Sequence, residues 1–254
     1  MRVIFLGTGG YHPNARRHTS CVLLPDIGLV FDAGTSFFRV QALLKTDEID
    51  VYLSHAHLDH VCGLTYFLVP LALGQVNAMR VHANRPTLDT VEQHVFAERL
   101  FPVAIPFAMQ ELTESRPVGQ GGTLRFQALP SHPGGSTAFR LDWPAESEGG
   151  RGRARSLAYV TDTTVDETYR EFIRGADVLI HECNFPDSQA HWCEKTGHSC
   201  TSPVARLARE AGVGRLILTH IDPQLDGDDP VDIATARAIF PNTVVAEDLM
   251  EFEL

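Results

Sequence analysis

The sequence predicts one α+β domain that spans residues 1–254 and contains a sandwich of sheets. A chain of 254 residues with 44% hydrophobic residues can bury a large core, and its length suits one large domain. Short apolar runs typical of strands alternate with segments of helical periodicity. Five of these runs end in side chains that bind metals or transfer protons: His55, His132, Asp162, His181 with Glu182, and His220. We therefore expect a polar rim along one edge of the sheets, where a functional site would lie.

The first elements are expected to be strands. Residues 3–6 form an apolar run before a glycine loop at 7–10, whose glycines permit tight turning. Apolar runs at residues 21–24 and 29–31 bracket a Pro-Asp-Ile-Gly turn and predict a hairpin. Arg16 and Arg17 lie between the glycine loop and this hairpin. They are either solvated loop residues or an anion clamp that binds substrate beside a metal site.

Helical segments follow in this half of the chain. We expect a helix over residues 36–44, a buried helix over 61–73 and a helix over 86–100, with Leu88, Val91 and Val95 facing inward. Residues 51–53 and 80–83 are expected to be short strands.

The second half repeats this alternation. Strands are expected at residues 123–129, 137–143, 157–160, 178–180 and 216–218, and the chain is expected to close with strands at 244–245 and around 249–254. Residues 144–156 predict a surface loop. A helix over 202–211 has Ser202 as its expected N-cap and Pro203 at its first position, and another helix is expected over 230–239.

The densest cluster of reactive side chains follows the strand at residues 51–53 and reads Ser-His-Ala-His-Leu-Asp-His. If strand direction persists through His55 and His57, both imidazoles lie on one side and can bind one ion. If the chain then turns into a helix after Leu58, Asp59 and His60 can face a second ion. This stretch therefore predicts half of a two-metal site, and the other half must come from elsewhere in the chain.

Charge and cysteine content set further limits. The formal net charge of -11 argues against broad nonspecific nucleic-acid binding. No apolar run approaches the roughly 20 residues that span a bilayer, so we expect no membrane association. Five cysteines without a disulfide-framework pattern fit a reducing compartment, and we expect a cytoplasmic protein. Cys193 and Cys200, near His191 and His198, leave open a further zinc site, although they lack a second cysteine pair.

The ordered motifs resemble those of the metallo-β-lactamase superfamily. The resemblance rests on the histidine stretch at 55–60, the later His132, the Thr-Asp-Thr turn at Asp162 and the Leu-Thr-His-Ile-Asp segment at His220. The opening Phe-Leu-Gly-Thr-Gly-Gly and the Phe-Asp-Ala-Gly turn at 31–34 are also similar. The resemblance implies a four-layer αββα sandwich with a dinuclear metal centre at one edge.

When the ligand positions of the superfamily are carried over to this sequence, the resemblance implies a complete set of metal ligands. One metal would be held by His55, His57 and His132, the other by Asp59, His60 and His220, and Asp162 would bridge them. Zinc suits this histidine-rich set best, but mixed histidine and aspartate ligation also accepts Mn²⁺ or Fe²⁺.

Within the superfamily, the sequence is most similar to the RNase Z-like phosphodiesterases. His-Glu-Cys-Asn-Phe at 181–185 resembles their His-Glu-Ala-Thr-Phe segment, and Gly-His-Ser-Cys-Thr at 197–201 resembles their His-Ser-Thr segment. The resemblance implies that His198 is a general acid and that Glu182 orients it. Asp59 joins these two as a catalytic candidate, and Glu182 could instead be only a structural hydrogen-bond partner of the site. The family also implies a homodimer.

The sequence departs from the RNase Z pattern at one place, and this difference bears on the substrate. Members that process tRNA carry a long glycine- and proline-rich arm between the positions that match His132 and Asp162. Here only two strands and the 144–156 loop fill that interval. The expected reaction is therefore attack of a metal-bridged hydroxide on a phosphodiester, either in a small cyclic phosphate or at an RNA 3′ end.

Three alternatives remain open. A thioester or lactone hydrolase could use the same metals without His198 as an acid. A non-hydrolytic iron protein of the same fold is disfavoured because Asp59 and His60 complete a hydrolase-type second site. A silent binding module would have lost ligands, whereas all seven are present in the sequence.

Overall fold

The computed structural model describes residues 1–145, 153–225 and 227–254. The chain forms two compact units, which are described separately below. Unit 1 comprises Met1–Glu114 and Glu247–Glu253, and unit 2 comprises Ser115–Ala246 and Leu254. Most of the expected 144–156 loop, including Arg151, lies outside the described residues. The organisation as a single domain stays a prediction.

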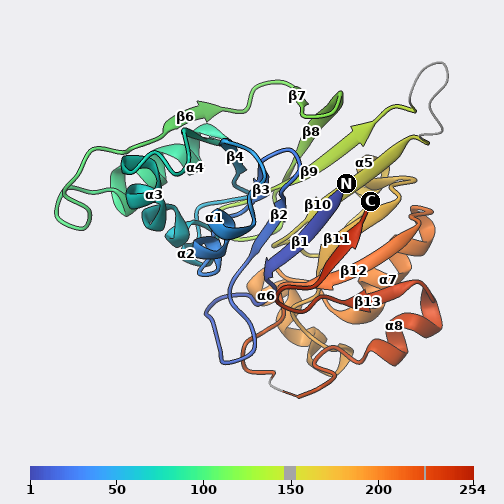
Figure 1. The fold of residues 1–254 in the computed structure, drawn as a ribbon. Helices are drawn as coiled ribbons and strands as arrows, with labels where there is room; N and C mark the ends of the chain where they lie inside the picture. Colours follow the sequence, from blue (N-terminus) through green and yellow to red (C-terminus); the bar gives the residue numbers. More distant parts are fainter. Residues whose placement is uncertain (146–152, 226) are drawn as a thin grey trace. The chain divides into compact units, whose positions relative to one another are not determined.

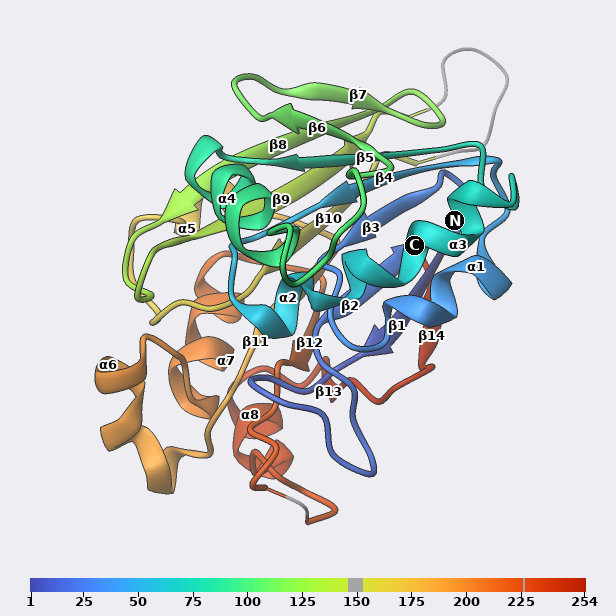
Figure 2. The same cartoon turned by 90° about the vertical axis from the view of Figure 1, so that its left-hand side faces the viewer.

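Unit 1 is built on a seven-stranded mixed sheet with the order β14-β1-β2-β3-β4-β5-β6 (Figures 1 and 2). The strands from β14 to β3 pair antiparallel, and those from β3 to β6 pair parallel. Their bounds are β1 (Arg2–Gly7), β2 (Cys21–Leu24), β3 (Leu29–Phe31), β4 (Glu48–Tyr52), β5 (Ala78–Ala83), β6 (Ala108–Glu111) and β14 (Glu251–Glu253).

Helices cover one face of this sheet, as Figure 2 shows for α1 to α4. A single apolar core joins the helices to the strands, and it includes Val40, Leu64 and Phe67 from the helices and Leu23 and Val51 from the sheet. The helices are η1 (Phe37–Arg39), α1 (Val40–Leu43), α2 (Leu58–Val61), η2 (Cys62–Phe67), α3 (Leu68–Ala72), α4 (Arg85–Thr90) and the π-helix η3 (Val91–Val95).

The prediction of one buried helix over residues 61–73 was wrong. The backbone leaves helical geometry at Val61, continues as the 3₁₀-helix η2 and returns to α-geometry only in α3. A Cβ at Gly63 would lie 2.3 Å from the carbonyl oxygen of Gly34, so this turn needs closer backbone approach than other residues allow. Val69 and Leu73 are also more than half exposed. The expected helix over 86–100 ends at residue 95, although its predicted inward residues are buried.

Unit 2 contains a second seven-stranded mixed sheet, with the order β13-β12-β11-β10-β9-β8-β7. Its strands pair antiparallel from β7 to β10 and parallel from β10 to β13. The bounds are β7 (Arg116–Val118), β8 (Gly122–Leu129), β9 (Ser136–Trp143), β10 (Arg155–Val160), β11 (Val178–Glu182), β12 (Arg215–Thr219) and β13 (Thr243–Val245).

The helices of unit 2 pack on its sheet through a second apolar core. This core contains Tyr169, Val204 and Ala236 from helices or their ends, together with strand residues such as Leu179 and Leu216. The helices are α5 (Arg170–Ile173), η4 (Asp187–Trp192), α6 (Cys193–Thr196), α7 (Thr201–Glu210) and α8 (Ile233–Ile239).

The predicted N-cap of α7 was wrong by two residues. The helix begins at Thr201 with Cys200 in the extended N-cap position. Ser202 instead lies inside the first turn, where both its backbone N–H and its hydroxyl donate to the carboxylate of Asp187. The Asp187 carboxylate therefore accepts a backbone N–H at the start of α7, which is the role expected of the Ser202 side chain.

Parallel pairing explains why polar side chains gather within each unit. The carboxyl ends of parallel strands meet at one edge of a sheet. In unit 1, Asp32 follows β3 and Ser54 follows β4. In unit 2, Asp162 lies just beyond β10, Glu182 ends β11 and His220 follows β12. Each sheet therefore carries its own set of polar side chains at one edge.

Candidate metal centre

The ring of His55 lies in contact with those of His57 and His60, just after β4. The ring centroids of His55 and His57 are 4.5 Å apart, and those of His55 and His60 are 4.3 Å apart. The strand direction assumed for His55 and His57 does not persist, because β4 ends at Tyr52, although the two rings still meet. The helix expected after Leu58 is also present as α2, with His57 in the extended N-cap position. Because α2 turns back towards the strand end, it brings His60 beside His55.

A buried carboxylate fixes two of these rings. His60 donates from Nδ1 to Oδ2 of Asp32 at 2.9 Å, and the hydroxyl of Ser54 donates to the same oxygen at 2.9 Å. The Ser54 hydroxyl oxygen also lies 3.0 Å from Nδ1 of His55. Since Nδ1 of each ring is engaged by a fixed partner, Nε2 is the atom that each histidine can offer to a metal.

Asp59 is held by the backbone of the loop after β1. The N–H of Tyr11 donates to Oδ2 of Asp59 at 2.8 Å. The same oxygen lies 3.3 Å from Nε2 of His60. Tyr11 has a φ of 56°, a left-handed conformation that non-glycine residues adopt at a cost. The strained turn therefore aims a backbone donor at a carboxylate that the sequence predicts as a ligand.

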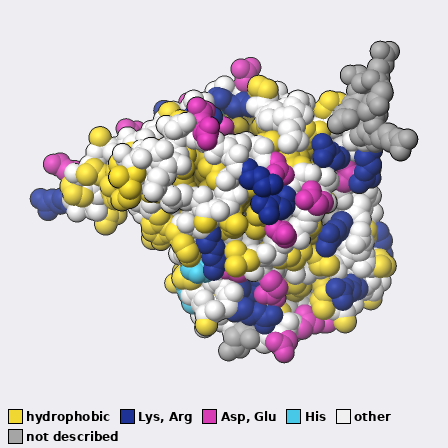
Figure 3. All heavy atoms as spheres, viewed as in Figure 1, with side chains coloured by type: hydrophobic (Ala, Val, Ile, Leu, Met, Phe, Trp, Pro, Cys, Tyr) yellow, Lys and Arg dark blue, Asp and Glu magenta, His cyan; other side chains and the backbone are white. Residues whose placement is uncertain are grey.

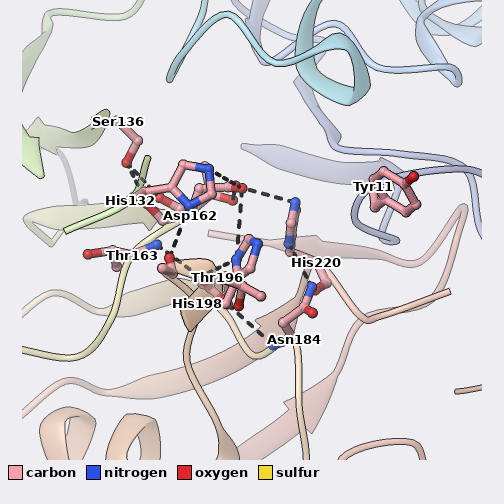
Figure 4. Close-up of polar contacts among 12 residues, drawn as sticks. Tyr11, His132, Ser136, Asp162, Thr163, Asn184, Thr196, His198 and His220 are labelled. Atoms are coloured by element: carbon pink, nitrogen blue, oxygen red, sulfur yellow. Dashed lines mark hydrogen bonds and ion pairs between the residues drawn. The ribbon is translucent and has the colours of Figure 1, made fainter. Parts of the chain in front are cut away.

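In unit 2, the carboxylate of Asp162 lies between two histidines (Figure 4). Its Oδ1 is 3.6 Å from Nε2 of His132, and its Oδ2 is 3.3 Å from Nε2 of His220. Donor atoms at two corners of a zinc tetrahedron lie roughly 3.4 Å apart, given Zn–N and Zn–O bonds of about 2.1 Å. Each oxygen of Asp162 could thus share a different ion with a different histidine.

Further contacts fix the orientation of these rings. His132 donates from Nδ1 to the carbonyl oxygen of Gly197 at 3.0 Å, which leaves Nε2 for a metal. The Asn184 side-chain amide contacts His220 at its carbonyl oxygen, at 2.9 Å, and at Nδ1, at 3.2 Å. Both histidines are buried. These contacts hold the rings in place before any ligand binds.

Backbone strain recurs at the strand ends that carry these groups. Asp32, Asp162 and His220 have φ values of 58°, 51° and 58°, all in the left-handed region. Each such residue costs on the order of 1 kcal/mol. Because this conformation turns the chain sharply at the end of a strand, it directs the side chain to the sheet edge. The strain is therefore concentrated where the predicted site residues lie.

His198 and Glu182 form a buried pair in unit 2. Nδ1 of His198 lies 3.0 Å from Oε1 of Glu182, and the Glu182 side chain is fully buried. The carboxylate also accepts backbone N–H groups, at Oε1 from Thr163 and at Oε2 from Asn184 and Ser199. These donors hold the carboxylate in place, so that Oε1 can accept the Nδ1 proton of His198.

His198 borders a cavity. The cavity has a volume of about 580 Å³, and its walls include His198, His191, Cys193 and Cys200. The His198 ring also lies 4.9 Å from the His132 ring and 5.2 Å from the His220 ring, measured between centroids. His198 is therefore close to the two histidines that flank Asp162 and is reachable from solvent.

His181 is separate from this group although it precedes Glu182. Its Nδ1 donates to the carbonyl oxygen of Glu182 at 2.6 Å, and its Nε2 accepts from the hydroxyl of Tyr169 at 2.9 Å. Burial lowers its pKa, so the ring is neutral. Both ring nitrogens are engaged within unit 2, which accounts for a polar residue inside β11.

Arg16 and Arg17 bind acidic side chains of unit 1. Both guanidinium groups lie 2.8 Å from Oε1 of Glu247. Arg17 also donates to the hydroxyl of Thr8 at 2.7 Å and is 2% exposed. These contacts tie the glycine loop to the C-terminal segment, and the role of both arginines in substrate binding stays a prediction.

The donor set fits divalent metals. Each unit supplies imidazole nitrogens and carboxylate oxygens whose other atoms are fixed by hydrogen bonds, as metal ligands usually are. In unit 2, His132, Asp162 and His198 have donor atoms within 4.8 Å of one another. The five cysteines all lie in described parts of the chain, and each is a thiol. No cysteine is in a possible metal-binding group found among the described residues.

Comparison with known proteins identifies the class. The chain belongs to the metallo-β-lactamase superfamily, because residues 28–221 match the family described as the beta-lactamase superfamily domain. A relative named Ribonuclease Z from Methanosarcina mazei is 30% identical, with 100% of this chain and 98% of the relative aligned. Another Ribonuclease Z, from Methanosarcina acetivorans, is 28% identical over the same shares of both chains. The RNase Z-like recognition is thereby confirmed.

Solved structures confirm the predicted fold class. The metallo-β-lactamase fold protein YhfI from Bacillus subtilis superposes with a TM-score of 0.79, 22% identity and 99% coverage of both chains. The short form of human tRNase Z superposes with a TM-score of 0.75 and 22% identity, over 100% of this chain and 99% of that chain. Within the described residues of this chain, no helix has the length and apolarity to cross a bilayer.

Sequence reasoning missed several residues that support the site. Asp32 lies in the Phe-Asp-Ala-Gly turn, and its position after an apolar run is the signal that it faces the same edge as His55. Asn184 lies in the segment 181–185, and its amide alone does not indicate a role there. Gly197 and Tyr11 act through backbone atoms, so side-chain chemistry could not reveal them.

Proposed function

We propose that this protein is a dinuclear-metal-dependent phosphodiesterase. In this proposal His55, His57 and His132 would hold one metal, Asp59, His60 and His220 would hold the other, and Asp162 would be a ligand of both. The observation that carries the proposal is the Asp162 carboxylate, whose two oxygens face two different histidines. Zn²⁺ fits the histidine-rich donor set best, with Mn²⁺ or Fe²⁺ as other candidates.

When bound, two such ions lower the pKa of a bridging water and neutralise the oxygens of a phosphodiester. The chain's own residues do the rest. Asp32 and the carbonyl oxygen of Gly197 keep His60 and His132 in the tautomer that offers Nε2. Glu182 holds the Nδ1 proton of His198, so the Nε2 edge can carry a second proton and donate it to the departing alkoxide.

The substrate class follows from the relatives and from one structural difference. Full-length relatives named Ribonuclease Z support a phosphodiester in RNA. The alignment with the Methanosarcina mazei protein spans 299 positions, more than the 254 residues of this chain, so that relative has insertions. Between His132 and Asp162, the described residues form only β9, β10 and their flanking turns. We therefore propose either an RNA 3′ end or a small cyclic phosphate as substrate, in a cytoplasmic protein.

Hydrolysis of bis(p-nitrophenyl) phosphate tests this proposal. Protein reconstituted with zinc or manganese should cleave it, and Asp162→Ala should lose both the activity and bound metal. A thioester and a lactone are assayed in parallel, and pre-tRNA and cyclic nucleotides follow if the diester is cleaved. Cleavage of only the thioester or lactone would replace the phosphodiesterase assignment with the alternative hydrolase on the same metal scaffold.

A further inference from the structure

Unit 1 contains an apolar cavity beside the histidine stretch. Its volume is about 560 Å³, which lies within the roughly 300–1,000 Å³ of small-molecule sites. Ala56 and Leu58 belong to its wall. They alternate with His57 and Asp59, so an occupant of the cavity would lie beside two predicted ligands.

The cavity is walled by large apolar and aromatic side chains. Tyr66 and Phe101 supply aromatic rings, and Leu58, Val95 and Leu100 supply aliphatic groups. Leu58 and Leu100 are each 71% exposed, and Tyr66 is 42% exposed. In Figure 3, hydrophobic side chains gather over the part of unit 1 where Figure 1 draws α3 and α4. Flat rings bind well between such side chains because they bury much area at little entropic cost.

Two hydroxyl groups in the cavity wall point to a ligand that donates hydrogen bonds. The hydroxyl of Thr65 donates to the carbonyl oxygen of Cys62 at 2.7 Å, and that of Thr90 donates to the carbonyl oxygen of Pro86 at 2.9 Å. Each hydroxyl has a single proton, which is already committed, so each can only accept from a ligand. A ring with N–H donors, such as an amino-substituted nucleobase, satisfies these acceptors.

A local irregularity supports a functional role for this wall. Residues Val91–Val95 form one turn of π-helix, closed by the N–H of Phe96 donating to the carbonyl oxygen of Val91 at 3.1 Å. His94 and Val95 in this turn line the cavity, as does Thr90 just before it. Isolated π-helical turns are less stable than continuous α-helix and occur often at functional sites. The turn therefore shapes the wall at some cost to the helix.

We propose that this cavity is a base-binding subsite that receives a nucleobase or similar aromatic ring of the phosphodiester. The inference rests on the proposed function, since it places the ring beside the predicted ligands His57 and Asp59. It adds a specificity element, because a diester with a flat aromatic group would bind more tightly than one with only alkyl groups.

Binding can be tested without metal or turnover. Metal-free protein with ¹³C-labelled leucine and valine methyl groups is titrated with adenosine and, separately, with ribose. Adenosine should shift the methyl signals of Leu58, Val95 and Leu100, and ribose should not. Leu100→Ala should raise the Kd for adenosine about tenfold. Leu73→Ala is the matched control, because Leu73 is 67% exposed in the same helical layer but does not line the cavity.

A kinetic comparison links the cavity to the reaction. Bis(p-nitrophenyl) phosphate and methyl p-nitrophenyl phosphate share a leaving group and differ in the second ester. Leu100→Ala should raise KM for the diaryl ester about tenfold and leave the methyl ester unchanged. If neither ester is hydrolysed, the proposed function is contradicted. The subsite is not, because adenosine binding is measured separately.

The subsite itself would be overturned by either of two results. One is an adenosine titration that leaves the Leu100 methyl signals unmoved or shifts those of Leu73 equally. The other is a Leu100 signal that changes on dilution of the protein in the absence of adenosine. That result would show that a second copy of the chain covers the cavity.

Discussion

Nδ1 of His198 lies 3.0 Å from a carboxylate oxygen of the fully buried Glu182, which also accepts three backbone N–H groups. This contact suits a histidine acid that a carboxylate holds in one tautomer. Because the carboxylate fixes the Nδ1 proton, the reactive edge of the ring is Nε2. His198 could donate a proton or bind a metal. The two roles predict different properties for a His198 variant, so substitution distinguishes them.

His198→Ala should lower kcat for the diester about a hundredfold while leaving the metal content unchanged. The expected loss is that of a general acid, and kinetics with metal analysis of the same samples measure it. His191→Ala is the matched control, because His191 lines the same cavity but is exposed. Loss of metal from His198→Ala would instead make His198 a ligand and remove the general-acid assignment.

Asp32→Asn should weaken zinc binding by about tenfold to a hundredfold. The amide keeps the shape of the side chain and tolerates the left-handed φ of 58°, but it no longer raises the basicity of His60 as a carboxylate does. Competition with a chromophoric chelator measures the affinity. Asp26→Asn serves as the control, since Asp26 pairs with Lys45 away from the histidines. Equal affinities in wild type and Asp32→Asn would refute the role given to Asp32.

Gly197→Ala should destabilise the protein more than Gly175→Ala. Both glycines have left-handed φ values, of 73° and 63°, and each substitution carries a strain of roughly 1 kcal/mol. Only at Gly197 would the new Cβ also collide, at 2.6 Å from Pro133 Cδ and 2.7 Å from His132 Cα. We expect a loss of roughly 2–4 kcal/mol in the free energy of unfolding at Gly197. Urea denaturation of metal-free protein measures both variants, and equal losses would contradict the packing argument.

Asp50 should make the stability of unit 1 depend on acid pH. Burial acts to raise its pKa, but hydrogen bonds from Arg80 and His82 outweigh burial and hold the pKa well below its usual range. A carboxyl whose pKa is depressed by folding stabilises the protein above its unfolded pKa of about 4. That stability is lost as pH falls through the folded value.

The Asp50 contribution can be isolated by substitution. Asp50→Asn should cost roughly 1 kcal/mol at pH 7, after allowance for solvent screening, and progressively less below about pH 4. Urea unfolding of metal-free protein across this range measures the difference from wild type. The exposed Asp47 provides the control variant Asp47→Asn, which should show no such trend. A difference independent of pH would contradict the assignment.

The sequence predicted most of the strands well, because strands rely on local pattern. Alternating apolar runs located β3, β4, β10, β11 and β12, and the residue after each run marked the edge that carries His55, Asp162 and His220. The short strands β6 and β7 were missed because they have little apolar content. The helix expected over 61–73 failed because close packing of Gly63 against Gly34 overrides local helical preference.

The supporting contacts could not be predicted from side-chain chemistry alone. The Gly197 carbonyl oxygen on His132 and the Tyr11 N–H on Asp59 involve backbone atoms of residues with no reactive side chain. They depend on chain turns 65 and 48 residues away in sequence from the groups they fix. The tertiary structure, rather than a motif, therefore supplies the orientation of the predicted ligands.

The metal content of purified protein tests the central claim most directly. After reconstitution with zinc and removal of excess metal, elemental analysis should find two zinc ions per chain in wild type. Asp162→Ala should hold fewer, because the proposed bridging carboxylate is gone. One zinc ion or none in wild type, or an unchanged content in Asp162→Ala, would contradict the dinuclear centre and the phosphodiesterase mechanism built on it.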